Sequence, residues 1–160
     1  LATNIAFDKN TQPIQIASAP TPGGRRAVAS GWGFQVGHTG HMTKELYKVE
    51  MTTVDPASCQ SYHQTTLYTH QICALGNAPG SGVCQGDSGG PLAVDGKLVG
   101  LVSYSVPCAT GPPDVFTSAY HYVDWIKGIQ DGSLKPVQQN QYGFFYPQFV
   151  PMVPFPGFGY

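Results

Sequence analysis

The sequence predicts an all-β fold, an antiparallel barrel or sandwich followed by one C-terminal helix. Six short segments rich in β-branched and apolar residues are separated by turns roughly every ten residues, which is typical of such folds. The chain also contains 20 Gly and 14 Pro, the residues that most often end strands and form turns. A length of 160 residues suffices for one domain with its own core.

The elements follow from the chain in order. Residues 1–26 are expected to form an extended connector that ends in the turn-rich stretch "APTPGGRR". The barrel is predicted over 27–118, with strands at 27–32, 44–54, 70–75, 91–94, 97–105 and 114–119. Asp55 and Pro56 are typical of a helix start, so a short helical turn should carry Cys59. Asp95-Gly96 predicts a tight hairpin between two of the strands.

The C-terminal region divides into a helix and a tail. Within 119–130, the residues Tyr122, Trp125, Ile126 and Ile129 recur at helical spacing, which predicts a helix packed on the barrel. Residues 131–160 are expected to be an extended or disordered tail, because after Lys135 they are uncharged and rich in Pro and aromatic residues. The tail is compatible with a flexible appendage or with a segment for self-association or surface docking.

Composition excludes several classes of function. The net charge is -1 and charged residues make up 11% of the chain, so no basic surface suited to a nucleic acid is expected. No apolar stretch reaches the length of a membrane-spanning helix. No metal-ligand motif is present and nothing implies a cofactor.

The four cysteines are Cys59, Cys73, Cys84 and Cys108. An even number without a Cys-x-x-Cys motif favours two structural disulfides in an oxidising compartment, over free buried thiols in a cytosolic protein. Three pairings are possible, and pairing 59 with 73 and 84 with 108 would close two separate loops of modest length.

The stretch "GVCQGDSGGPL" at 82–92 raises the question of whether Ser88 is a nucleophile. A serine needs a base, an oxyanion site and a pocket before it does chemistry. The Gly-x-Ser-x-Gly pattern also occurs in the nucleophile elbow of α/β-hydrolases, for which Asp114 and His121 would supply the triad order. That elbow requires a strand before the serine and a helix after it, whereas Ser88 follows a loop and precedes a predicted strand.

The fuller pattern resembles the trypsin/chymotrypsin family of serine endopeptidases, over roughly residues 1–130. The matching stretches are "SGWG" at 30–33, "CQGDSGGPL" at 84–92, "LVGLVSYS" at 98–105 and "PDVFTSAYHYVDWI" at 113–126. The resemblance implies the second six-stranded barrel of a two-barrel fold. It also implies the pairings Cys59–Cys73 and Cys84–Cys108, and the absence of a third family disulfide whose positions are Ala27 and Val94 here.

The same resemblance implies the roles of the site residues. Ser88 would be the nucleophile, the amides of Gly86 and Ser88 would form the oxyanion hole, and Asp87 would pair with the amino terminus created by zymogen cleavage. The edge that binds the substrate backbone would consist of Ser103, Tyr104 and Ser105.

The specificity pocket is expected to be chymotrypsin-like. Its floor would lie at Gly82 and Val83, and the trypsin-like aspartate is replaced by Gly82. Ser105 and Asp114 stand where the family has pocket glycines, so Ser105 would narrow the entrance and Asp114 would bring a carboxylate to the base. The combination resembles chymotrypsin-like and collagenolytic digestive proteases of arthropods, and implies cleavage after large apolar residues with some tolerance for basic ones.

The triad His and Asp are expected to be absent. In the family both precede the serine and lie on the N-terminal side, whereas no histidine of this chain matches the catalytic position and Asp8 lacks the expected context. The chain is therefore predicted to be an inactive C-terminal fragment of a secreted, active protease whose missing N-terminal barrel is its partner and whose substrates are polypeptides. The alternative is a non-catalytic homologue that binds without cleaving.

Overall fold

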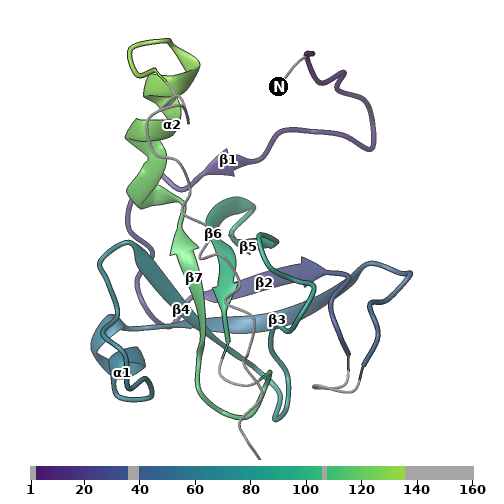
Figure 1. The fold of residues 1–160 in the computed structure, drawn as a ribbon, viewed down its shortest axis with the longest axis vertical. Helices are drawn as coiled ribbons and strands as arrows, with labels where there is room; N and C mark the ends of the chain where they lie inside the picture. The colour runs from purple at the N-terminus through teal and green to yellow at the C-terminus, as the bar shows by residue number, and fades with distance from the viewer. Residues whose placement is uncertain (1–2, 36–39, 106–107, 136–160) are drawn as a thin grey trace, which may run out of the picture.

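The computed structural model describes residues 3–35, 40–105 and 108–135, and its centre is a closed antiparallel barrel. Six strands form the barrel: β2 (Arg26–Gly31), β3 (Tyr47–Val54), β4 (Gln71–Gly76), β5 (Pro91–Val94), β6 (Lys97–Tyr104) and β7 (Asp114–Ser118). The pairing runs β6-β5-β2-β3-β4-β7 and returns to β6 (Figure 1). The predicted all-β barrel is thus confirmed, because full closure leaves none of these six strands as a free sheet edge.

Two short elements lie outside the barrel. Strand β1 (Gln15–Ile16) pairs with β6 in parallel, which fixes the end of the N-terminal segment against the barrel. Helix α1 (Pro56–Gln60) follows β3 and carries buried Cys59, as Asp55 and Pro56 predicted. The Asp55 side chain makes no capping hydrogen bond, so Pro56 at the start of the helix is the residue that favours it.

The barrel interior is filled by apolar side chains from every strand. Met51, Leu92 and Phe116 are fully buried and belong to one cluster. Gly100 faces this cluster, and a Cβ added there would lie 3.0 Å from the Cβ of Phe116. The core is therefore closely packed at this strand crossing, where only glycine fits without displacing Phe116.

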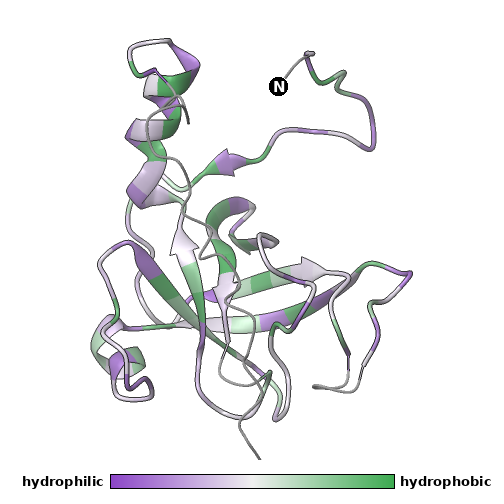
Figure 2. Ribbon diagram, in the orientation of Figure 1, coloured by the Kyte–Doolittle hydropathy of each residue, from purple (hydrophilic) through white to green (hydrophobic). Residues whose placement is uncertain are grey.

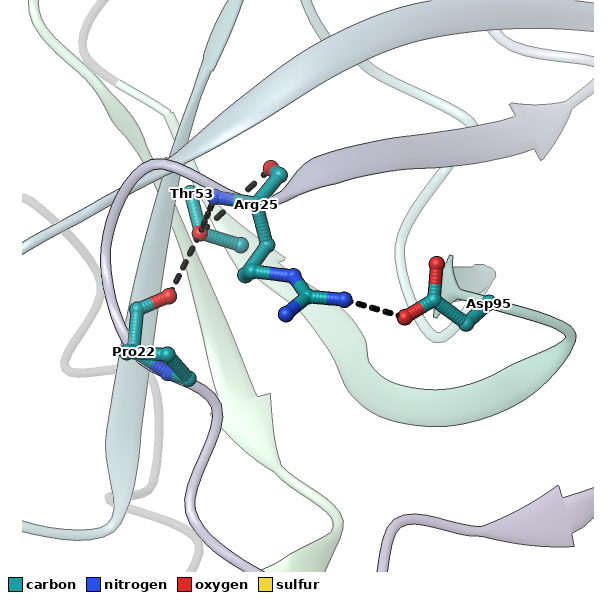
Figure 3. Close-up of polar contacts among 4 residues, drawn as sticks. All are labelled: Pro22, Arg25, Thr53 and Asp95. Carbon is teal, nitrogen blue, oxygen red and sulfur yellow. Dashed lines mark hydrogen bonds and ion pairs between the residues drawn. The ribbon is translucent and has the colours of Figure 1, made fainter.

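Local turns also follow their sequence signals. Asp95 and Gly96 both have positive φ, 49° and 73°, as a two-residue hairpin turn between β5 and β6 requires. The turn before β2 is held by buried Thr53, whose hydroxyl donates to Pro22 O at 2.7 Å and accepts from Arg25 N–H at 2.9 Å (Figure 3). The Arg25 guanidinium pairs with the Asp95 carboxylate, so the two turns are joined at the surface.

Both disulfides form as the family resemblance implies. Cys59 is bonded to Cys73 and Cys84 to Cys108. The first joins α1 to β4, and the second joins the stretch around Ser88 to the segment before β7. In β2 and β5, Val28 is opposite Ala93, so the next pair in the register is Ala27 and Val94, the two positions of the absent third disulfide.

The C-terminal helix forms but its packing differs from the prediction. A short 3₁₀ helix, η2 (Tyr120–Tyr122), leads into α2 (Val123–Gln130), which lies beyond the end of β7 and away from β2 and β3 (Figure 1). Polar and apolar residues alternate around α2 (Figure 2), yet Trp125 is 56% exposed and Gly128 is the only buried residue. The expectation that this helix packs on the barrel was wrong for Trp125, because periodicity shows which residues share a face and not what covers it.

The strand predicted at 44–54 starts later, at Tyr47. Leu46 precedes the strand and is 58% exposed, and Tyr47 at its first position is 49% exposed. The buried residues of β3 are Met51 and Thr53, nearer the centre of the barrel. Of the tail predicted at 131–160, residues 131–135 are described, and Leu134 N–H donates to Gly128 O of α2 at 2.8 Å. The rest, about which the sequence left two interpretations open, lies outside the described residues.

Candidate active site

Residues 82–90, here called the motif loop, connect the region after β4 to β5 and carry Ser88. The loop is held by backbone hydrogen bonds at both ends of its tip. Asp87 N–H donates to Cys84 O at 3.0 Å, and Gly90 N–H donates to Asp87 O at 2.9 Å. Strand β6 fixes the far side, because Gly89 N–H donates to Val102 O and Val102 N–H donates to Gly90 O, both at 2.9 Å. The barrel therefore sets the position of Ser88.

Ser88 is exposed at the tip of this loop. Within the described part of the chain, no group hydrogen-bonds its hydroxyl. Gly86, two residues earlier, has φ of +94°, a backbone conformation that residues with a side chain rarely adopt. An exposed hydroxyl next to a glycine-only backbone position leaves room for a substrate carbonyl against the loop.

The Asp87 carboxylate turns away from Ser88 and into the protein. Its Oδ1 accepts from Gly33 N–H at 2.8 Å, and its Oδ2 accepts from Cys84 N–H at 3.0 Å. A Cβ on Gly31 would lie 2.1 Å from Asp87 Oδ1, and one on Gly33 would lie 2.5 Å from Oδ2. The two glycines of "SGWG" are therefore needed because the carboxylate rests directly on their backbone.

Asp114, at the start of β7, is 3% exposed and points at the other end of the motif loop. Its Oδ2 accepts from Val83 N–H at 2.9 Å, and a Cβ on Gly82 would lie 2.6 Å from the same oxygen. Burial raises the pKa of Asp114 to about 6, the negative charge of Asp87 adds to the increase, and the Val83 hydrogen bond opposes it. Gly82, Val83 and Asp114 therefore lie together, and their role as the base of a pocket stays a prediction.

A cleft of about 520 Å³ opens beside these groups, on the side of the loop where Asp87 lies. Its charged lining residues are Asp87 and Lys48, and its apolar lining residues include Phe34, Val49 and Val83. Neither Ser88 nor Asp114 lines this cleft. It can accept a positively charged group attached to an apolar side chain.

The comparisons with known proteins agree with this geometry. A family model described as Trypsin matches residues 1–126. The chain belongs to the trypsin family. The family consists of serine endopeptidases, so the α/β-hydrolase alternative does not apply.

Individual relatives point the same way. The chain is 35% identical to chymotrypsin-2 of Vespa crabro over 81% of its length and 59% of that protein, and 38% identical to trypsin eta of Drosophila melanogaster over 72% and 44%. A structure of neuropsin, a serine protease of mouse brain, matches with a TM-score of 0.74 and 31% identity, over 79% of this chain and 57% of that one. The chain therefore spans about half the length of the relatives it matches.

Within this trypsin-family chain, β6 ends next to the motif loop. The last residue of β5 pairing is Pro91 opposite Leu101, so the register leaves Ser103, Tyr104 and Ser105 beyond the end of β5. Ser103 is exposed, whereas Tyr104 and Ser105 are half-buried. These three residues are the ones predicted to bind a substrate backbone. They lie past the end of the β5 pairing, while on the other side of β6 Tyr104 still pairs with Val115 of β7.

The histidines occupy other places. His63 is buried, with its Nε2 3.0 Å from Pro113 O, where it can only donate because a carbonyl only accepts. His70 and His121 lie in a separate aromatic group with Tyr68 and Tyr122, their ring centroids 5.7 Å apart. His41 is exposed and makes no hydrogen bond with Ser88, and His38 lies outside the described residues.

Two features of the site were not predicted from the sequence. The first is the placement of the Asp87 carboxylate on Gly31 and Gly33, for which the only signal was the spacing of two glycines around Trp32. The second is Met42, which lies against Gly86, since a Cβ there would be 3.4 Å from Met42 Cγ. No cluster of metal-ligating side chains occurs among the residues that the structure describes, and none of its helices is long and apolar enough to cross a membrane.

Proposed function

We propose that Ser88 is the nucleophile of a peptide-bond hydrolase that works through an acyl-enzyme. The Ser88 oxygen attacks the scissile carbonyl and passes its proton to a base, the amine leaves with that proton, and water then hydrolyses the ester. The amides of Gly86 and Ser88 stabilise the oxyanion in both steps. The observation that carries this proposal is the exposed hydroxyl of Ser88, which has no hydrogen-bond partner among the described residues and precedes Gly89 and Gly90, both hydrogen-bonded to Val102 of β6.

The base and its carboxylate partner come from outside these residues in this proposal. His63 is hydrogen-bonded to Pro113 O, His70 and His121 lie against tyrosine rings, and among the described residues no histidine is hydrogen-bonded to Ser88. The part matched here covers 59% of chymotrypsin-2 and 57% of neuropsin. A second barrel bearing His and Asp is the partner that would complete the triad, and without it the chain should not turn over peptides.

Asp87 is assigned the pairing with a new amino terminus after zymogen cleavage. Its carboxylate lines a cleft whose other walls include Ala29, Val49 and Val83, which suits an ammonium next to an aliphatic side chain. The pairing would add a cation to a carboxylate that two backbone amides already orient.

Specificity is assigned to Gly82, Val83, Ser105 and Asp114. With glycine at position 82 and a carboxylate that is buried and hydrogen-bonded to Val83, the base of the pocket accepts large apolar side chains and tolerates basic ones when Asp114 is ionised. The edge formed by Ser103 to Ser105 would pair with the substrate backbone. Two disulfides and the match to a snake venom serine protease of Bungarus multicinctus support secretion.

Fluorophosphonate labelling tests the catalytic part of this proposal. In the longer protein that contains the second barrel, Ser88 should label rapidly and Ser88→Ala should abolish labelling, while Ser18→Ala, at an exposed serine of the connector, should leave it unchanged. The 160-residue chain alone should label slowly or not at all. Absence of labelling in the longer protein would instead support the non-catalytic homologue.

Peptide substrates that differ only at the residue before the cleaved bond test specificity. An Asp114→Gly change in the active longer protein should reduce turnover of Lys and Arg substrates relative to Phe and Leu substrates. Unchanged ratios would remove any electrostatic role of Asp114.

A further inference from the structure

Met42 is an exposed methionine whose side chain lies against the backbone of Gly86. The position of a Cβ on Gly86 is 3.4 Å from Met42 Cγ and 3.5 Å from Met42 Cε. The sulfur is bonded to both of these carbons, so the thioether group covers one side of Gly86. Because Met42 is 61% exposed, a small solute in water can reach this group.

Residues 32–34 hold the two partners of this contact in place. Their backbone makes one hydrogen bond to the residue after Met42 and one to the residue before Gly86. These bonds, both 2.9 Å long, run from Thr43 N–H to Trp32 O and from Phe34 N–H to Gln85 O. The backbone therefore sets the positions of both Met42 and Gly86.

The other sulfur atoms of the described residues are less accessible to an oxidant. All four cysteines are bonded in disulfides, so no free thiol competes for it. Of the other two methionines, Met51 is fully buried in the barrel core and Met152 lies outside the described residues. Among the described residues, the Met42 thioether is thus the sulfur that a dissolved oxidant reaches most readily.

We propose that Met42 is a site of oxidation by hydroperoxides, and that its sulfoxide displaces Gly86 and slows the reaction of Ser88. The Met42 sulfur attacks one oxygen of hydrogen peroxide, and an S–O bond forms as the O–O bond breaks. The sulfur is oxidised, the peroxide is reduced, and the proton of the transferred hydroxyl leaves with the departing hydroxide as water. This inference rests on the proposed function, because it takes the Gly86 amide as part of the oxyanion hole.

The sulfoxide changes the contact at Gly86 because it is polar and larger than the thioether by one oxygen. Its oxygen seeks hydrogen-bond donors, which the Cα of Gly86 does not provide, so the side chain either turns towards water or presses on Gly86. The backbone there has little freedom, since its φ is +94° and the same Cβ position lies 3.1 Å from Gly33 Cα. A displaced Gly86 N–H no longer points at the place where the oxyanion forms, and its stabilising effect falls.

Brief treatment of the 160-residue chain with hydrogen peroxide tests the modification and its structural effect. Mass spectrometry of the digested chain should show that Met42 sulfoxide forms roughly tenfold or more faster than Met51 sulfoxide. In a Met152→Leu chain, the same treatment should shift the NMR signal of the Gly86 amide and leave that of Gly96, in the hairpin turn, unchanged. Met42→Leu keeps an apolar side chain that peroxide does not oxidise, so its Gly86 amide should not shift.

The longer protein that contains the second barrel tests the effect on the reaction. Peroxide should lower kcat on a peptide substrate by roughly tenfold and change KM little, because the oxyanion forms only during the reaction. The rate of Met42→Leu after peroxide should equal its own rate before. Met152→Leu should lose as much as the wild type, because it retains the Met42 thioether.

The outcomes separate this inference from the function on which it rests. Oxidation of Met42 no faster than that of Met51, or an unshifted Gly86 amide after oxidation, overturns the inference and leaves the proposed function standing. Equal losses of rate in Met42→Leu and the wild type overturn it as well. If the longer protein does not label with a fluorophosphonate before peroxide, the proposed function and the predicted loss of rate both fail. The Gly86 amide then still decides whether oxidation of Met42 displaces the motif loop.

Discussion

The motif loop and helix α2 are both short segments near the surface, and they are held in opposite ways. The motif loop is tied to β6 by backbone hydrogen bonds and to Gly33 through the Asp87 carboxylate. Helix α2 has one buried residue, Gly128, and its largest apolar side chain, Trp125, is more than half exposed. The difference shows that the described residues fix the position of Ser88 through the barrel but leave Trp125 of the helix largely exposed.

The largest effect on stability is expected where the Asp87 carboxylate contacts the backbone of Gly31 and Gly33. Gly31→Ala would place a Cβ 2.1 Å from Asp87 Oδ1, so either the carboxylate leaves its two amides or β2 shifts. We expect a loss of roughly 3 kcal/mol or more in the free energy of unfolding, from overpacking and from buried amides left without an acceptor. Urea unfolding measures the loss, and faster hydrogen exchange at Gly33 N–H shows its origin. Full retention of protection at Gly33 would contradict this explanation.

The Cys84–Cys108 disulfide is the next contribution to the motif loop. Replacing both cysteines by serine should cost about 3 kcal/mol, since the bond closes a separation of 24 residues. The matched control is the Cys59 and Cys73 pair, with a separation of 14, for which loop entropy alone predicts a few tenths of a kcal/mol less. Only the first double variant should also increase hydrogen exchange at Gly33. Equal exchange in both double variants would mean that the Cys84–Cys108 disulfide does not stabilise the hydrogen bond between Gly33 N–H and Asp87.

The buried carboxylate of Asp114 should reduce stability as pH rises. Its pKa is about 6 in the folded protein and near 3.8 when unfolded, so the folded state holds the proton more strongly between these values. The wild type therefore loses stability as pH rises from about 4 to above 6, by roughly 2 to 3 kcal/mol from this group. Asp114→Asn keeps an acceptor for Val83 N–H and should flatten that slope, measured by urea unfolding at several pH values, whereas Asp124→Asn should not.

How far the sequence predicted the structure depended on how local the signal was. The hairpin at Asp95-Gly96 and the helix start at Pro56 were predicted correctly, because turn and cap chemistry act over a few residues. The residues alone left three disulfide pairings open, and the structure has the two that the family implies. The hydrogen bond from Gly33 N–H to the Asp87 carboxylate was not predicted, because it joins residues 54 positions apart that only the register of the barrel brings together.

The prediction that failed concerns exposure. Trp125 was assigned from its periodicity to the face of a helix packed on the barrel, and it is exposed. Periodicity identifies a face, but burial depends on whether another element lies against it, and this depends on the whole fold. The roles of Ser88 and Asp87 remain predictions, because geometry brings the groups together without showing a reaction.

Gly128→Ala in α2 is the matched control for Gly31→Ala, because it makes the same substitution in the region that has few buried residues. A Cβ on Gly128 would lie 2.6 Å from Leu134 Cδ1, the end of a side chain that is 45% exposed and can move aside. Alanine also stabilises a helix interior relative to glycine, so Gly128→Ala should change the free energy of unfolding by less than about 1 kcal/mol, in the stabilising direction. A loss comparable to that of Gly31→Ala would show that α2 is as closely packed as the motif loop.

The smallest effect on stability is expected at Trp125. Because its side chain is 56% exposed, Trp125→Gln should change the free energy of unfolding of this chain by no more than about 0.5 kcal/mol. An exposed tryptophan on a helix surface favours association between molecules. If α2 contributes to self-association, the variant should therefore sediment as a smaller species than the wild type. Tyr120→Gln, at a half-buried position of η2, is the control that should cost more stability and change sedimentation less. A large loss from Trp125→Gln would mean that the side chain is packed in solution, and that the contrast between α2 and the motif loop is smaller than the structure indicates.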